Sequence, residues 1–182
     1  EELMKYISFV FQNTKLFKTS LLENIKYGNP DATMEEVERA VDMAQCREII
    51  NKLPLGLNTK IGTEGTYLSG GEQQRIVLAR AILKNAPIIV LDEATAFADP
   101  ENEHLIQQAL KELTKGKTVL ILYTSLSYRL IMDHNILVID KGKIAEQGTH
   151  ANLLGKQGIY YHMWNEYQQS VRWTIGKEVS ND

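Results

Sequence analysis

The sequence predicts an α/β fold with a mostly parallel sheet. Two short apolar runs, Ala86–Leu91 and Val119–Tyr123, have the length and composition of strands that are buried on both faces. Helix-like segments alternate with these runs from residue 69 onward, which is typical of strand–helix–strand units. An earlier strand is followed by a long helical stretch, so we expect one sheet interrupted by a helical insertion.

The first part of the sequence predicts a strand followed by several helices. Tyr6–Phe11 alternates and is rich in β-forming residues, which predicts a strand that ends before Gln12. Ser20–Ile25 is expected to form a short helix. Thr33–Glu36 has the pattern of a capping box. It opens a helix whose apolar face comprises Val37, Ala40, Val41 and Ala44. A further short helix is expected near Arg47–Leu53.

The second half supplies the remaining elements. Ser69 is the expected N-cap of a helix over 71–83, and Pro100 has the place of a first helical residue. Further strands are expected at 88–91, 118–123, 136–139 and 143–145, and closing helices at 149–154 and 158–172. We therefore divide the chain into a core, 1–12 and 86–182, and a helical subdomain, 13–85.

The bulk properties exclude several classes of protein. The net charge of −3 argues against a broad nucleic-acid surface, which is usually basic. The single cysteine, Cys46, cannot form an internal disulfide, so we expect it to be buried in a protein of a reducing compartment. No apolar run approaches the roughly 20 residues that span a bilayer, and no secretory signal is present. The chain starts at Glu1 and enters a strand almost at once, which suggests a fragment of a longer protein.

Two carboxylates follow the run Ile88–Leu91. Asp92 and Glu93 should therefore lie at the carboxyl end of a buried strand, where ligands bind in open α/β sheets. One acid can hold a Mg²⁺ ion and the other can polarise an attacking water. An alternative is a strand that ends in a solvated acidic turn.

The string Leu68-Ser69-Gly70-Gly71-Glu72-Gln73-Gln74-Arg75 predicts an anion site. Ser69 and two glycines at a helix start would leave backbone N–H groups and the helix dipole facing an anion. An ordinary capped helix is the alternative for Ser-Gly-Gly alone. The longer string, ahead of the Asp-Glu strand, favours the functional interpretation.

This string resembles the signature motif of ATP-binding cassette (ABC) proteins, and the Asp92-Glu93 strand resembles their Walker B motif. Gln12 resembles the glutamine of the Q-loop, and Ala98-Asp99-Pro100-Glu101 resembles the D-loop, although Phe97-Ala98 departs from the usual residues. Gly62–Gly65 resembles the X-loop of exporter-type cassettes. The resemblance implies the C-terminal part of a P-loop NTPase (RecA-like) core with an inserted ABC helical subdomain.

The resemblance also implies a function and roles for individual residues. The chain would be the ATPase part of an exporter-type transporter, with ATP and Mg²⁺ as cofactors. Glu93 would be the general base, Asp92 the Mg²⁺ ligand, and Gln12 the sensor of Mg²⁺ and water. The signature residues Ser69, Gly70, Gly71 and Glu72 would serve nucleotide held by a second, head-to-tail cassette, with Glu72 and Arg75 supporting the helix. Asp99 and Thr124 complete the expected nucleotide site.

The resemblance further implies binding partners and a cellular location. The implied partners are the second cassette and a transmembrane domain, with no nucleic acid and no membrane span in this chain. The implied location is the cytoplasmic face of the plasma membrane of a bacterium.

Two family features are absent from the sequence. The phosphate loop Gly-x-x-x-x-Gly-Lys-Ser/Thr does not occur. Gly116-Lys117-Thr118 does not replace it, because it is expected to end a helix and enter a strand, the reverse of a phosphate loop. Thr124 occupies the place of the family's histidine beside the γ-phosphate, and threonine can carry no charge there. We therefore expect this chain alone to be inactive.

Alternatives of other classes remain open at this point. A non-catalytic cassette could keep its signature to complete a partner's site while its own site is degenerate, as Thr124 suggests. A soluble ABC protein of DNA repair or translation fits the exporter-like segments and the acidic balance less well. Four residues at helical spacing, Tyr160, Met163, Trp164 and Tyr167, are expected to form a packing stripe, and His104, His150 and His162 to lie on the surface or in packing.

Overall fold

The structure is a computed structural model that describes residues 2–11, 16–62, 67–92, 100–122 and 135–178. The chain forms two compact units, Glu1–Leu122 and Tyr123–Asp182. Within the described residues no helix has the length and apolar character that crossing a membrane requires. The predicted limits of the helical subdomain, 13–85, stay a prediction.

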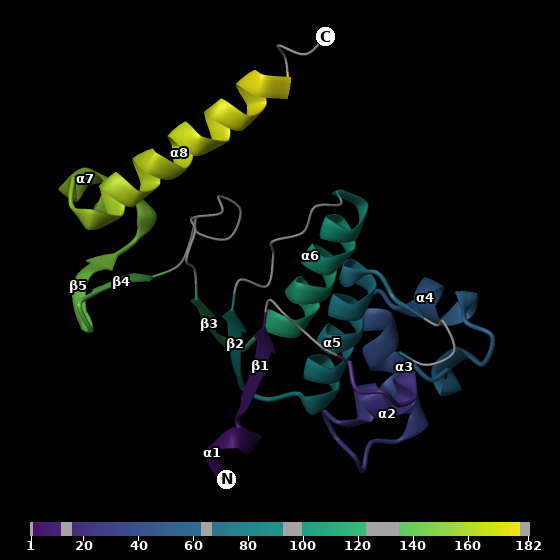
Figure 1. Ribbon diagram of the computed structural model, residues 1–182. Coiled ribbons are helices and arrows are strands. Elements are labelled where there is room, and N and C mark those ends of the chain that lie inside the picture. The colour runs from purple at the N-terminus through teal and green to yellow at the C-terminus, as the bar shows by residue number, and fades with distance from the viewer. Residues whose placement is uncertain (1, 12–15, 63–66, 93–99, 123–134, 179–182) are drawn as a thin grey trace. The chain divides into compact units, whose positions relative to one another are not determined.

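A parallel sheet organises the first unit (Figure 1). It consists of β1 (Ile7–Phe11), β2 (Ile88–Asp92) and β3 (Thr118–Leu122), with β2 between the other two. The three central residues of β2 are buried, as expected of a middle strand with an apolar sequence. The predicted α/β fold with a parallel sheet is confirmed.

Apart from a short helix ahead of β1, the helices of this unit begin where their sequences predict. Three of them carry a capping box, in which a serine or threonine hydroxyl and a glutamate three residues later each accept a backbone N–H. They are α2 (Leu21–Lys26) after Ser20, α3 (Met34–Met43) after Thr33 and α5 (Gly70–Lys84) after Ser69. The unit is completed by α4 (Arg47–Lys52), the 3-10 turn η1 (Gly56–Asn58) and α6 (Pro100–Thr114).

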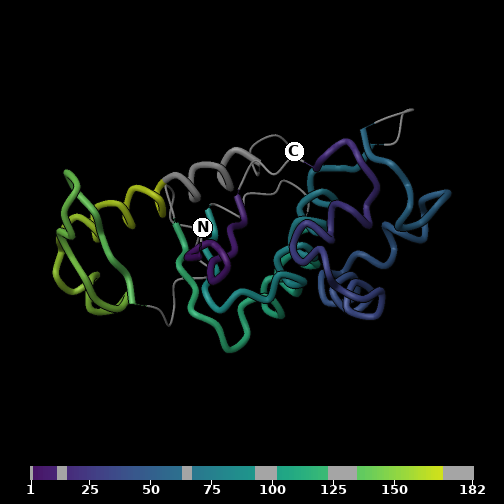
Figure 2. The backbone as a smooth tube through the Cα atoms, turned by 90° about the horizontal axis from the view of Figure 1, so that it is seen from below, coloured from purple at the N-terminus to yellow at the C-terminus, as the bar shows by residue number. Residues whose placement is uncertain are grey.

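Helix α5 is the centre of the first unit. It packs against the sheet and α6 on one side and against α2 and α3 on the other, and the segment α2–α4 gathers on the side of α5 away from the sheet (Figures 1 and 2). Both faces of α5 are therefore buried, including Ile76, Leu78 and Ala79. The predicted apolar face of α3 is confirmed, because all four of its residues are buried.

A short helix, α1 (Glu2–Lys5), precedes the first strand and was not expected from the sequence. Lys84 at the end of α5 donates to the carbonyl oxygens of Met4, at 2.9 Å, and Ile7, at 2.7 Å. This contact ties the start of the chain to α5. A lysine that binds carbonyl groups so distant in the sequence leaves no local pattern, so sequence inspection cannot find it.

The second unit pairs a hairpin with two helices. The strands β4 (Ile136–Asp140) and β5 (Lys143–Gly148) are antiparallel, and α7 (His150–Lys156) and α8 (Ile159–Glu178) follow. The packing stripe on α8 is correct for Tyr160, Trp164 and Tyr167, which join one apolar cluster. It is wrong for Met163, which is 38% exposed. Met163 is adjacent to Trp164 in the sequence, and adjacent side chains of a helix point in different directions.

A prediction on stability follows from Gly28, which lies against the backbone of α5. A Cβ added there would lie 2.1 Å from the carbonyl oxygen of Arg80, and a backbone atom cannot swing aside as a side chain can. Gly28→Ala should therefore lower the free energy of unfolding by about 2 kcal/mol, the scale of overpacking. Urea denaturation followed by far-ultraviolet circular dichroism measures the change. Gly155→Ala is the control, because a Cβ added at that helical glycine would meet no atom within 4 Å, so the free energy of unfolding should not fall.

Candidate functional site

The carboxyl edge of the parallel sheet brings three strand ends together. Phe11, Asp92 and Leu122 are aligned in the register of β1, β2 and β3. The predicted residues Gln12, Glu93 and Thr124 come directly or almost directly after them in the sequence. These three, and Asp99, lie outside the described residues, so their assignment stays a prediction.

Asp92 is the one predicted metal ligand within the described residues. It closes β2 and is half-buried, with Phe11 on one side of it in the register and Leu122 on the other. No described hydrogen bond or ion pair engages its carboxylate. Carboxylate oxygens are the ligands that Mg²⁺ prefers in proteins. The carboxylate of Asp92 is therefore a suitable ligand for the predicted magnesium ion.

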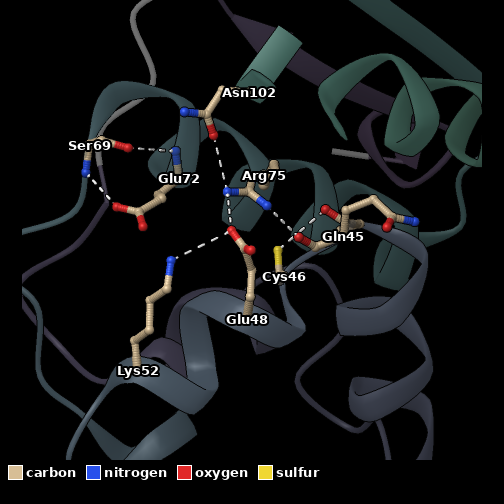
Figure 3. A network of polar contacts seen from close by, with 9 residues as sticks. Gln45, Cys46, Glu48, Lys52, Ser69, Glu72, Arg75 and Asn102 are labelled. Atoms are coloured by element: carbon tan, nitrogen blue, oxygen red, sulfur yellow. Dashed lines mark hydrogen bonds and ion pairs between the residues drawn. The ribbon is translucent and has the colours of Figure 1, made fainter. Parts of the chain in front are cut away.

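The start of α5 carries the predicted anion site. Ser69 Oγ accepts the backbone N–H of Glu72 at 3.2 Å, and the Glu72 carboxylate accepts the N–H of Ser69 at 2.8 Å (Figure 3). A serine hydroxyl that accepts one bond still has its own hydrogen to donate. The first N–H groups of a helix also lack intrahelical acceptors. This helix end can therefore offer several donors to an anion, while Glu72 is engaged in the cap.

Gly70 and Gly71 differ in their surroundings although they are neighbours. Gly70 is exposed, and a Cβ added there would meet no atom within 4 Å. Gly71 is buried, and its added Cβ would lie 2.7 Å from Cγ of Asn102 on α6. Gly70 thus leaves open space at the helix start, whereas Gly71 permits close contact between two helices.

Arg75 lies beneath this helix start and is almost fully buried. Its Nη1 donates to the carbonyl oxygen of Gln45 at 2.7 Å (Figure 3). Gln45 has a left-handed backbone, with φ of 57°, which directs its carbonyl toward the guanidinium. Burial raises the pKa of the nearby Cys46 thiol to about 12, against a smaller opposing effect of the Arg75 charge. The expectation of a buried Cys46 is confirmed.

A second polar cluster joins α5 to the segment that follows Gln12. The side-chain oxygen of Asn24 accepts the N–H of Phe17 at 2.9 Å and Arg80 Nη2 at 3.0 Å. Its nitrogen donates to the carbonyl oxygens of Phe17 and Ser20. Burial lowers the pKa of the Arg80 guanidinium. Sequence inspection missed this cluster, because Asn24 and Arg80 belong to different helices.

Two further predictions are confirmed by the backbone and by packing. Gly116 has φ of 71° between the end of α6 and the start of β3, so Gly116-Lys117-Thr118 ends a helix as expected. His150 Nδ1 shares a hydrogen bond of 2.6 Å with Tyr160 and contacts the Trp164 ring, which is a packing role. His104 is exposed and contacts Gln108.

The described contacts do not join the two halves of the candidate site. None of the hydrogen bonds or ion pairs among described residues links Asp92 to Ser69–Glu72. The expected head-to-tail arrangement, in which Asp92 and the start of α5 would serve different nucleotides, does not require such a link.

Comparisons with known proteins agree with these features. Residues 1–96 match the family model described as ABC transporter. The chain is 46% identical over 168 residues to an ATP-dependent lipid A-core flippase of Legionella pneumophila (strain Paris), covering 92% of this chain and 28% of the relative. It is 43% identical over 169 residues to a mycobactin import ATP-binding/permease protein of Mycolicibacterium smegmatis, covering 93% of this chain and 19% of the relative.

A solved structure is similar as well. It is a bacterial Atm1-family ABC exporter with ATP bound, with a TM-score of 0.76 and 37% sequence identity. The match covers 90% of this chain and 28% of that chain. The present chain thus spans about a quarter of the length of such proteins, or less.

Proposed function

This chain belongs to the ABC transporter family, and on that premise we propose that it forms part of the ATP-hydrolysing motor of an exporter-type transporter. The start of α5 carries the proposal. There, the exposed N-cap residue Ser69 adjoins Gly70, where an added Cβ would meet only open space. A phosphate can approach such a helix end closely and meet both the hydroxyl and backbone donors.

We assign the start of α5 to nucleotide held by another subunit. Ser69 would donate its hydroxyl hydrogen to a γ-phosphate oxygen while its Oγ keeps the cap with Glu72. Gly70 and Gly71 would offer backbone N–H groups. Glu72 would act indirectly, because its carboxylate holds the N–H of Ser69.

The carboxyl edge of the sheet would serve nucleotide bound by this chain's own subunit. Asp92 would hold a Mg²⁺ ion, whose charge offsets that of the phosphates when it is bound. Glu93 would accept the proton of the attacking water, and Gln12 would orient that water. Asp99 and Thr124 would complete the site. The aligned ends of β1, β2 and β3 support this assignment.

The partners follow from the same proposal. A second cassette would pair head to tail with this one, and a transmembrane domain would receive the mechanical work. The protein would be located at the cytoplasmic face of a bacterial plasma membrane. The names and lengths of the flippase and exporter relatives support these proposals.

The proposed function is tested by comparing substitutions at two N-cap residues, Ser69 and Thr33. Ser69→Ala and Thr33→Ala each remove a capping hydroxyl, so each should cost about 1 kcal/mol of stability. Only Ser69→Ala should lower ATP turnover in the full-length protein, by about tenfold, because only Ser69 would donate to phosphate. Steady-state phosphate release measures the difference. Equal turnover in both variants would contradict the proposal.

The sequence also favours a second candidate function, that of a degenerate cassette. Thr124 stands in the family's histidine position, so this subunit's own site would hydrolyse poorly while α5 completes a partner's site. The same assay separates the two functions when Glu93→Gln is added. A motor subunit loses turnover with Glu93→Gln, whereas a degenerate cassette keeps it and responds only to Ser69→Ala.

A further inference from the structure

The Nη2 nitrogen of Arg75 has two acceptors on two different helices. It lies 3.2 Å from Oε1 of Glu48 on α4 and 3.1 Å from Oδ1 of Asn102 on α6 (Figure 3). The Arg75 side chain is 2% exposed, whereas that of Glu48 is 52% exposed. Water therefore weakens the contact with Glu48 more than the contact with Asn102. Of these two acceptors, we expect Asn102 to limit the position of Arg75 more strictly.

Asn102 also lies close to the backbone of Gly71 on α5. The 2.7 Å that would separate its Cγ from a Cβ on Gly71 leaves no room for a side chain between the two helix starts. Asn102 is thus fixed from two directions, by contact with the Gly71 backbone and by the hydrogen bond from Arg75. An amide held in this way sets the spacing between the first turn of α5 and the first turn of α6.

This contact lies beside the proposed anion site. Gly71 belongs to the start of α5, which also contains Ser69. Asn102 is the third residue of α6. A change in spacing between α5 and α6 would therefore move Ser69 and Gly70 relative to α6.

We propose that Asn102, held by Arg75, is a positioning residue that keeps the start of α5, with Ser69 and Gly70, in a fixed position against the first turn of α6. The inference rests on the proposed function and adds a residue that acts through others. The contact aligns groups for hydrolysis and does not touch the nucleotide. Its loss should therefore lower kcat and leave KM for ATP nearly unchanged.

Two substitutions of Asn102 test the hydrogen bond in the full-length protein. Asn102→Leu has a similar size but no acceptor, so kcat should fall about tenfold, the scale of one bond to a charged group. Asn102→Asp keeps an oxygen for Arg75 and adds an opposite charge, so kcat should stay within about twofold of the original. Thermal unfolding of each variant confirms that the protein is folded.

Glu48→Leu is the matched control. It removes the other acceptor of the same nitrogen at nearly the same distance, as Asn102→Leu removes the first, so a merely structural role of the Arg75 network would affect kcat in both variants. We expect Glu48→Leu to leave kcat unchanged. A fall in kcat with Glu48→Leu as large as with Asn102→Leu would overturn the inference.

A parallel measurement on Ser69→Ala keeps the inference separate from the proposed function. If Ser69→Ala has no effect on turnover, the proposed function fails. If Ser69→Ala lowers turnover but Asn102→Leu leaves kcat unchanged, the function stands and the positioning role of Asn102 is wrong. A rise in KM without a change in kcat would also overturn it, since Asn102 would then contribute to nucleotide binding.

Discussion

Asp92→Asn should lower ATP turnover of the full-length protein on the order of a hundredfold, the loss expected when a metal site is disturbed. Asp92 is half-buried at the carboxyl end of β2, with Phe11 and Leu122 beside it in the register. An amide has a similar shape but no charge, so it would hold Mg²⁺ more weakly and offset less of the phosphate charge. Turnover measured across a Mg²⁺ titration should show that the variant needs more of the ion.

Asp140→Asn is the control for this experiment. Asp140 also ends a strand, β4, but it is exposed and adjoins the hairpin turn. Its substitution should leave both turnover and the Mg²⁺ requirement unchanged. If Asp92→Asn behaved like Asp140→Asn, the carboxylate of Asp92 would belong to a solvated turn, which is the alternative that the sequence left open.

The helices and strands of this chain could be predicted where the residues that mark them lie close together in the sequence. A capping box needs only two residues three positions apart, so Thr33–Glu36 and the helix that follows are apparent from the sequence. The same spacing at Ser69 and Glu72 predicts the start of α5. A buried strand such as β2 is similarly marked by a continuous apolar run that ends in Asp92.

The contacts that join these elements were not predictable, because they depend on residues far apart in the chain. Asn102 near a helix start suggests a surface position, yet it contacts Arg75 and the backbone of Gly71. Asn24 likewise binds Arg80 on another helix. The register that aligns Phe11 with Asp92 also requires the fold, since the whole helical segment separates them in the sequence.

The two adjacent glycines at the start of α5 should respond differently to alanine. Gly70→Ala places a methyl group in open space, so the free energy of unfolding should stay within about 0.5 kcal/mol of the original, as for most exposed substitutions. The same methyl group would occupy space through which a partner's phosphate approaches the helix end. Turnover in the full-length protein should therefore fall about a hundredfold, the scale for loss of one preorganised donor.

Gly71→Ala should instead destabilise the fold, by about 2 kcal/mol, because its methyl group would meet Asn102. Arg75 restrains Asn102, so the amide cannot simply turn away. Denaturation of the chain measures the loss, and adding Asn102→Ala should recover much of it by removing the atoms in conflict. Since Gly70→Ala is expected to reduce turnover without loss of stability, the pair separates phosphate access from helix packing. Equal loss of stability in both variants would show that Gly70 serves the fold and would remove the reason for assigning it to nucleotide.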